Sequence, residues 1–354
     1  MRLKQLVDRL PVLGVDAILV GQPENRRYLS GFTGSASWLI VSGERAVLVT
    51  DSRYYEQVGR ESPDWELARV TATLPQALGE QLGGVRRLGF ESQHLTVDQL
   101  ASFSQAAPGV EWLPLKDTVE TLRAVKDEGE VEAIRRAVAL TDEALAHALA
   151  VLRPGMTERQ VAWEIEVYMR THGAGKVAFD LIVAAGPNGA IPHARPGDRP
   201  IQAGEPIVFD LGCMLDGYCS DLTRTVCLGR PPDRVLEVWN IVLDAQQTAE
   251  AAMRAGLPGA QADAAARAVI VAAGYGDQFG HGLGHGVGLA VHEKPAAGRL
   301  STDTLAAGNI VTVEPGIYLP GEFGVRIEDL VLVREDRVDI LSAAPKQPFV
   351  EIGG

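Results

Sequence analysis

The stretch that decides the fold runs from Asn309 to Leu332 and reads NIVTVEPGIYLPGEFGVRIEDLVL. Its two halves are apolar and rich in β-branched residues, a composition typical of strands. Between them lies Pro320-Gly321-Glu322, a three-residue turn signal whose glycine can take a left-handed conformation. The stretch therefore predicts a β-hairpin, with Glu314 in one strand and Glu328 in the other.

The register of this hairpin brings the two glutamates together. A three-residue turn pairs Leu319 with Phe323, and the same register, counted outward, pairs Glu314 with Glu328. Their Cβ atoms would then be roughly 5 Å apart on one face of the sheet. Like charges in such a pair destabilise a sheet unless a positive charge lies between them. The hairpin therefore predicts a bound cation.

Length and composition describe a soluble protein of two domains. The chain has 354 residues, of which 46% are apolar and 22% charged, and it is long for one ordinary domain. Its formal net charge of -13 argues against binding to nucleic acids or anionic membranes, since both require a concentrated basic surface. Carboxylates gathered around metal ions would account for part of this negative excess.

The sequence predicts a cytoplasmic location. Residues 1–20, MRLKQLVDRLPVLGVDAILV, alternate charged and apolar residues and so lack the unbroken apolar core of a signal peptide. No run reaches the roughly 18 apolar residues of a membrane span. Cys213, Cys219 and Cys227 match no common zinc spacing, and they fit small strand residues of a reduced protein better than a disulfide framework.

We expect an α/β domain over residues 1–122 and a second domain over residues 123–354. The first part alternates short apolar strands with helical segments and has no phosphate-loop or dinucleotide spacing. Within it, Asn25 to Phe32 mixes polar and aromatic residues, which indicates either a ligand-facing loop or packing between elements, with packing favoured. A long helical pattern begins near Asp127 and opens the second domain.

The second domain is predicted to contain an internal duplication. Two helix pairs are joined by similar connections, Arg153-Pro154-Gly155 and Leu257-Pro258-Gly259. Asp210 lies 56 positions after the first of these prolines, and Glu314 lies 56 positions after the second. Chance agreement of one spacing is the alternative. We expect two αα-ββ halves of about 104 residues each, related by a pseudo-twofold axis.

The first of these halves has its own acidic hairpin. Residues 207–226, IVFDLGCMLDGYCSDLTRTV, turn at Asp216-Gly217, a strong type I′ signal. The register that follows places Asp221 opposite Gly212 and therefore makes Asp210 and Asp221 diagonal neighbours on one face. Each acid alone could be an exposed strand residue. Four carboxylates in two same-face pairs favour a shared metal site instead.

A glycine-rich segment between the hairpins supplies imidazoles. It reads FGHGLGHGVGLAVHE over residues 279–293 and contains His281, His285 and His292, three of the seven histidines of the chain. A lone histidine is usually structural, but this cluster favours side chains near a site that the backbone approaches closely. The glycines do not follow a nucleotide-binding spacing. Four carboxylates with an imidazole suit two divalent cations of the manganese, cobalt or zinc kind.

With these segments, the chain resembles the pita-bread metallopeptidases of the M24 type, within them the Xaa-Pro branch of aminopeptidase P and prolidase. YLSGFTGS and LRAVKDEGEVEAIRRA extend the resemblance over nearly the whole chain. It implies a creatinase-like N-terminal α/β domain before a pita-bread catalytic domain, an α/β (α+β) fold overall. It also implies two divalent metal ions, with manganese favoured over cobalt or zinc. The metal ligands implied are Asp210, Asp221, His285, Glu314 and Glu328, with Asp221 and Glu328 bridging the ions.

The resemblance implies roles for other residues as well. His193, in NGAIPHA, and His292 would contact the substrate and stabilise the tetrahedral intermediate, and His281 would line the proline side of the cleft. Arg326 would orient carboxylates, and Glu314 would carry the proton from water to the leaving nitrogen. The alternative for each of these side chains is that it simply fills a loop or a surface.

The implied activity is hydrolysis of the bond between an N-terminal residue and a following proline, by a hydroxide shared between the two metals. Small prolidases carry an arginine shortly after the HExP segment, where this chain has Ala296. We therefore expect an Xaa-Pro aminopeptidase, with an Xaa-Pro dipeptidase as the alternative if Arg299 or a partner subunit supplies the charge. A non-catalytic peptide-binding relative is disfavoured, because all five ligand positions are filled. The resemblance also implies a homodimer or a larger homo-oligomer.

Overall fold

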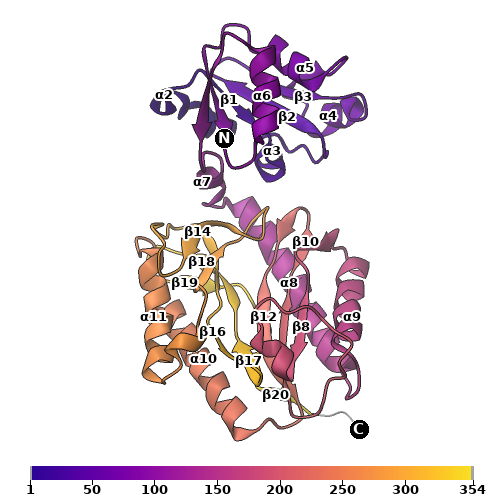
Figure 1. The fold of residues 1–354 in the computed structure, drawn as a ribbon, viewed down its shortest axis with the longest axis vertical. Helices are drawn as coiled ribbons and strands as arrows, with labels where there is room; N and C mark the ends of the chain where they lie inside the picture. Colours follow the sequence, from indigo (N-terminus) through magenta and orange to yellow (C-terminus); the bar gives the residue numbers. More distant parts are fainter. Residues whose placement is uncertain (1, 352–354) are drawn as a thin grey trace. The chain divides into compact units, whose positions relative to one another are not determined.

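The computed structural model describes residues 2–351, and the chain forms two compact units, Met1–Arg123 and Ala124–Gly354 (Figure 1). Each unit is built around its own sheets and its own buried core. Among the described residues, no helix is long and apolar enough to cross a membrane.

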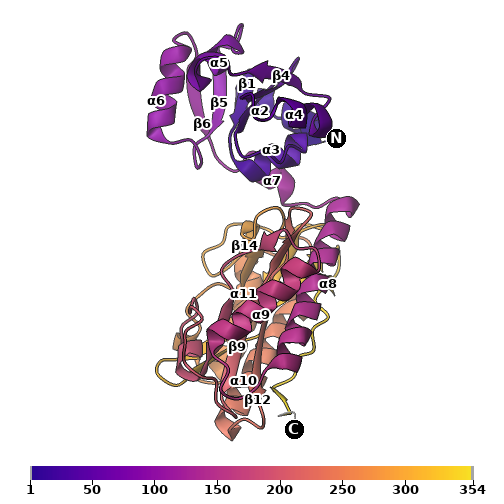
Figure 2. The ribbon, with the colours of Figure 1, turned by 90° about the vertical axis from the view of Figure 1, so that its right-hand side faces the viewer.

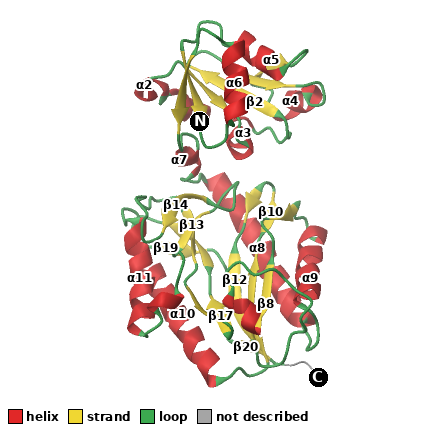
Figure 3. Ribbon diagram, in the orientation of Figure 1, coloured by secondary structure: helices red, strands yellow, loops and turns green. Residues whose placement is uncertain are grey.

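The first unit contains a mixed six-stranded sheet, whose strands are yellow in Figure 3. Its strand order is β4-β3-β2-β1-β5-β6. Strands β1, β2 and β3 pair antiparallel, and the remaining neighbours pair parallel. The segment from Asn25 to Phe32 lies largely in a helix whose side chains are mostly buried, so it serves packing. The strands are β1 (Ala17–Val20), β2 (Ser37–Ser42), β3 (Ala46–Thr50), β4 (Glu66–Arg69), β5 (Arg87–Glu91) and β6 (Glu111–Leu115). The helices are α1 (Arg2–Val7), α2 (Leu10–Leu13), α3 (Pro23–Ser30), α4 (Tyr55–Glu61), α5 (Leu74–Glu80), α6 (Val97–Ala106) and α7 (Glu120–Arg123).

The second unit places two helix pairs on the outside and strands between them (Figures 1 and 2). Thr157 forms a capping box with Gln160 at the start of the second long helix, and Asp127 forms another with Glu130 at the start of the first. The long helices are α8 (Glu128–Val151), α9 (Glu158–Thr171), α10 (Asp233–Ala252) and α11 (Gly259–Ala272). Two short 3₁₀ turns, η1 (Gly186–Ala190) and η2 (Gly276–Gln278), precede segments that carry the histidines.

The strands of the second unit form two larger sheets, β20-β12-β9-β8 and β14-β13-β15-β18-β19, and two smaller ones, β11-β10-β7 and β16-β17. Those of the first half are β7 (Lys176–Val177), β8 (Ile182–Ala185), β9 (Pro206–Leu211), β10 (Cys213–Leu215), β11 (Tyr218–Cys219) and β12 (Leu222–Leu228). Those that follow are β13 (Gly284–Gly286), β14 (Glu293–Ala297), β15 (Ile310–Val313), β16 (Gly316–Leu319), β17 (Phe323–Arg326), β18 (Asp329–Val333), β19 (Val338–Ile340) and β20 (Phe349–Val350).

Both halves of this unit have the same backbone hydrogen bond shortly after their first long helix. Its position corrects one detail of the predicted duplication. The Gly155 N–H donates to Ile201 O, and the Gly256 N–H donates to Leu305 O. The glycines are 101 positions apart and their acceptors 104, so the second half has three extra residues in between. Pro258 occupies the N-cap of α11, the place of Thr157 in α9, and is therefore not the equivalent of Pro154.

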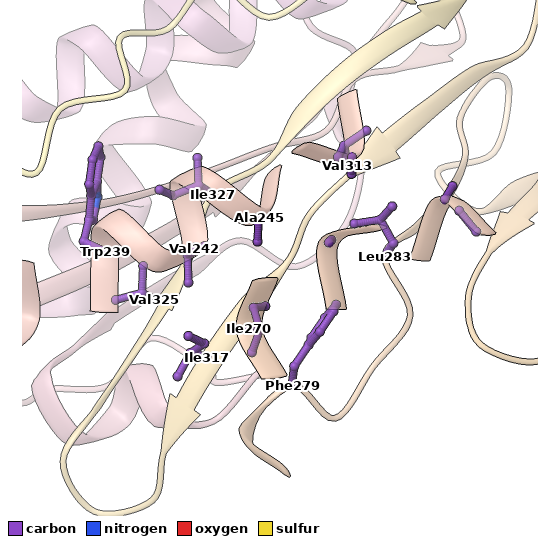
Figure 4. Close-up of a cluster of buried hydrophobic side chains, with 14 of the residues drawn as sticks. Trp239, Val242, Ala245, Ile270, Phe279, Leu283, Val313, Ile317, Val325 and Ile327 are labelled. Atoms are coloured by element: carbon purple, nitrogen blue, oxygen red, sulfur yellow. The ribbon is translucent and has the colours of Figure 1, made fainter. Parts of the chain in front are cut away.

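Each half buries its helix pair against its own strands. In the second half, Val242 of α10 and Ile270 of α11 pack in one cluster with Ile317 of β16 (Figure 4). The corresponding cluster of the first half joins α8 and α9 to β9 and β12. The apolar faces of the helices thus point inward and pack against the two acidic hairpins, which keeps the hairpins in fixed positions.

Candidate active site

The glutamate hairpin has the predicted register, but its ladder is interrupted at the glutamates. Leu319 pairs with Phe323 in β16 and β17, and Val313 pairs with Asp329 in β15 and β18, so the same register holds on both sides. Between these ladders, the Glu314 N–H donates to Leu283 O at 2.9 Å and the Glu328 N–H donates to Thr223 O at 3.0 Å. Each glutamate therefore joins the hairpin to another segment of the chain.

The aspartate hairpin is interrupted in the same way. Asp216 and Gly217 have φ values of 52° and 85°, as a type I′ turn requires, and Asp210 pairs with Thr223 in the predicted register. Asp221 lies in the gap between β11 and β12, opposite Gly212. A Cβ atom at Gly212 would lie 2.2 Å from Ser220 O, so only glycine permits this close approach of the strands.

The two hairpins and the histidine segment bring all five expected ligands together. Carboxylate oxygens of Asp210, Asp221 and Glu328 lie within 4.8 Å of one another. His285 Nε2 lies 3.7 Å from Asp221 Oδ2 and 3.4 Å from Glu314 Oε1. Four carboxylates and one imidazole from five separate strands and strand connections thus surround one small volume.

The negative charge of this cluster would be balanced by bound cations. Burial raises the pKa of Glu314 to about 7, and it holds the pKa values of Asp221 and Glu328 well above the usual carboxylic range, with neighbouring carboxylates adding to the effect. Arg326 forms an ion pair with Asp210. One guanidinium cannot offset four acids, so the cluster is a poor structural ion pair and a good metal site.

Two further observations fit metal ions at this place. Asp210 Oδ1 and Glu328 Oε1 are buried, and neither has a hydrogen-bond partner among the described residues. His285 Nδ1 lies 3.1 Å from Gly286 O, which makes it the protonated nitrogen and leaves a lone pair on Nε2. That lone pair faces carboxylate oxygens, which are acceptors too, so a cation between them resolves the conflict.

Hydroxyl groups and Arg326 hold the carboxylates in place. Thr223 Oγ1 donates to Glu328 Oε2 at 2.6 Å, and Thr312 Oγ1 donates to Glu314 Oε1 at 3.1 Å. Arg326, which is buried, also donates from Nε to Thr223 Oγ1 at 3.1 Å. The orientation of carboxylates by Arg326 was expected. The sequence analysis missed both threonines. Thr223 pairs with Asp210 across two strands, and Thr312 lies two positions before Glu314 along the chain.

A cavity of about 490 Å³ opens beside the cluster. His193, His281 and His292 all line it, together with the five candidate ligands and Arg326. The rings of His285 and His292 are 4.2 Å apart between centroids, and burial lowers the pKa values of both imidazoles. The structure therefore places every site residue expected from the sequence at one cavity.

Tyr318 is a further site residue that the sequence reasoning missed. Its hydroxyl lies 3.0 Å from His281 Nε2 and accepts a hydrogen bond from Arg326 Nη1 at 2.7 Å. Burial lowers the pKa of His281 to about 4, so this ring is neutral and is held by Tyr318 and by Gly282 O. The available signal was its position four residues after Glu314, on the same hairpin.

Two αα-ββ halves that enclose a carboxylate and imidazole cluster define a pita-bread metalloenzyme, here preceded by a creatinase-like α/β domain. Residues 132–335 match the Metallopeptidase family M24, and residues 2–125 match the Creatinase/Prolidase N-terminal domain. The chain belongs to metallopeptidase family M24 and is a hydrolase, as the resemblance implied.

Relatives match along the whole chain. An Xaa-Pro dipeptidase of Pyrococcus furiosus is 35% identical, with 98% of this chain and 99% of the relative covered. The structure of an Xaa-Pro dipeptidase from Bacillus anthracis superposes with a TM-score of 0.96 at 37% identity, covering 99% of both chains. That of an X-Pro aminopeptidase from Thermotoga maritima superposes with a TM-score of 0.91 at 38% identity, covering 99% of this chain and 100% of that one.

Proposed function

We propose that this protein is an Xaa-Pro dipeptidase that uses two divalent metal ions. The observation that carries the proposal is the buried cluster of four carboxylates and His285 at the cavity, with two buried carboxylate oxygens that have no partner among the described residues. The preference for an aminopeptidase expected from the sequence is set aside, because the Pyrococcus and Bacillus relatives are both named Xaa-Pro dipeptidases. Aminopeptidase activity on longer Xaa-Pro peptides is the second candidate, since the Thermotoga relative is named for it.

The metal ions would be held by all five side chains. These are Asp210, Asp221, His285, Glu314 and Glu328. When bound, such a pair of ions activates water and polarises the scissile carbonyl. We expect manganese to support the activity best, with cobalt or zinc as substitutes, because the donor set mixes oxygen with one imidazole nitrogen.

The remaining steps belong to the side chains of the cavity. The nitrogen of an Xaa-Pro bond carries no proton, so it must receive one to leave as the proline amine. Glu314, at the cavity wall and held by Thr312, would take a proton from the attacking water and deliver it there. His292 and His193 would donate hydrogen bonds to the oxygen on which negative charge develops. His281, held by Tyr318, would pack beside the proline ring.

The test is hydrolysis of Ala-Pro and Ala-Pro-Ala by protein loaded with manganese, cobalt or zinc. We expect turnover of the dipeptide, and we expect Glu314→Gln to lose at least about 100-fold in kcat while the protein remains folded. Loss of metal ions in the variant would be checked by metal analysis. The proposal is wrong if the loaded wild-type protein cleaves neither peptide. Light scattering of the same samples tests the expected homodimer.

A further inference from the structure

The cavity has one positive group that is not engaged with the rest of the site. Its wall carries five acids, Asp180, Asp210, Asp221, Glu314 and Glu328. Arg326 is committed to Asp210 and Tyr318. His285 lies against two of these acids, and His281 is held by Tyr318. Arg195 also lines the cavity and is exposed, and its guanidinium has no hydrogen bond or ion pair among the described residues.

The loop that carries Arg195 is fixed at both ends, so the side chain starts from a defined position. Glu158 is 1% exposed and accepts hydrogen bonds from Ala185 N at 2.7 Å, Asn188 Nδ2 at 2.8 Å and Gly197 N at 2.8 Å. Asn188 Nδ2 also donates to Arg195 O at 3.3 Å. Nearer the metal cluster, Arg326 Nη1 donates to Pro192 O at 3.3 Å. The backbone on both sides of Arg195 is thereby held against the cavity wall.

The position in β14 where a charge was expected carries none. Ala296 pairs with His285 across β13 and β14, so its methyl group lies on the face of the sheet that carries the imidazole. A cation at this position would reach the site, but alanine cannot supply it. Arg299, the nearest arginine along the chain, does not line the cavity.

The chemistry of the substrate makes such a cation necessary. In an Xaa-Pro dipeptide the free carboxylate is attached to proline Cα, two bonds from the scissile nitrogen. It therefore enters the same cavity, where burying a charge that has no partner of its own is unfavourable. We propose that Arg195 binds the α-carboxylate of the substrate's proline and selects dipeptides. This inference rests on the proposed function and names the group that sets its substrate class.

The test compares Ala-Pro with Ala-prolinamide, which differ in the carboxylate alone, on manganese-loaded protein. Arg195→Met keeps the length of the side chain's apolar stem and removes its charge. Loss of a charge-assisted hydrogen bond should raise KM for Ala-Pro roughly 10- to 100-fold, while KM for Ala-prolinamide changes less than about twofold. Arg195→Lys should restore part of the loss on Ala-Pro, because it restores the charge without the fork of the guanidinium. Arg299→Met is the matched control and should leave both substrates unchanged.

The outcomes separate this inference from the proposed function. An equal loss on both substrates in Arg195→Met, or no loss on either, overturns the inference while Xaa-Pro hydrolysis stands. A loss in Arg299→Met confined to the carboxylate substrate also overturns it and assigns the role to that arginine. Failure of the wild-type protein to cleave either substrate refutes the proposed function, and the inference falls with it. Metal content and circular dichroism establish that each variant is folded and loaded.

Discussion

Replacing Arg224 by methionine would test whether a buried charge cluster behind the metal centre holds Glu328 in place. Arg224 is 2% exposed and lies in β12, directly after Thr223. Its guanidinium donates to Glu328 O, to Thr223 O at 3.0 Å, to Ala344 O at 2.7 Å and to Asp329 Oδ1 at 2.7 Å. Because the Glu328 N–H is also bonded to Thr223 O, Arg224 completes the fixation of that ligand's backbone.

The expected cost follows from the charge left behind. Removing one partner of a buried ion pair destabilises a protein by roughly 3–5 kcal/mol. Lys346 Nζ lies 2.6 Å from Asp329 Oδ2 and remains as a partner, which places the cost of Arg224→Met near the lower end, at about 3 kcal/mol. For a domain of this size, about 2–4 °C in Tm per kcal/mol gives a decrease of roughly 6–12 °C.

The assay is differential scanning calorimetry of the metal-free protein, combined with calorimetric titration of manganese. Trp239→Phe is the control, because Trp239 Nε1 donates to Thr225 O at 2.9 Å and so supports the same strand without contacting Glu328. The control should lose stability and keep its metal affinity, whereas Arg224→Met should lose both. A decrease in Tm below about 2 °C, or an unchanged manganese affinity, would refute the reasoning.

Three further predictions concern pH, the cavity loop and the glycine segment. Burial raises the pKa of Glu250 from 4.5 to about 8, so the protonated carboxyl favours the folded state and stability is lost as the pH rises through this interval. Glu250→Gln stays neutral and should lose less stability between pH 5 and 8, by at most about 4 kcal/mol, and parallel Tm curves for the two proteins would contradict this. Glu158→Gln should loosen the Arg195 loop and raise KM for Ala-Pro several-fold, while the metal affinity stays unchanged. Glu164→Gln, on the same helix, should leave both KM and the metal affinity unchanged. Gly284→Ala should reduce Tm and bound manganese, because its Cβ would lie 2.1 Å from Thr312 O, while Gly280→Ala, with open space around its Cβ, should match the wild type in both measurements.

The registers of both acidic hairpins could be predicted because turn length alone determines them. The two-residue turn at Asp216-Gly217 and the three-residue turn after Leu319 each leave one way to pair the strands, and a period of two then places the acids on one face. The interruptions at Glu314 and Glu328 could not be predicted in this way. They depend on Leu283 and Thr223, whose approach is a tertiary event that no local pattern encodes.

The same limit explains the other departures. The proline spacing suggested one uniform offset between the halves, but three residues are added between Gly256 and Leu305, and a count from one proline does not reveal them. Tyr318 and Thr312 read as ordinary strand residues, and only their contacts with His281 and Glu314 reveal their roles. The clustered histidines were recognisable from the sequence because imidazoles near acidic residues indicate metal binding. Tyr318 and Thr312 were not, because tyrosine and threonine are also common as ordinary strand residues.

The charge balance of the site gives a physical reason for two metal ions rather than one. With its imidazoles neutral, the cluster of four carboxylates and Arg326 has a formal charge of -3 when every acid is ionised. One divalent cation would leave it at -1, which would oppose the negative charge that develops on the carbonyl oxygen during hydrolysis. A second cation brings the charge to +1, which favours that charge and lets all four acids ionise despite their burial. The raised pKa values of Asp221, Glu314 and Glu328 and the proposed binding of two cations thus have one cause, four acids gathered by two hairpins into one small volume.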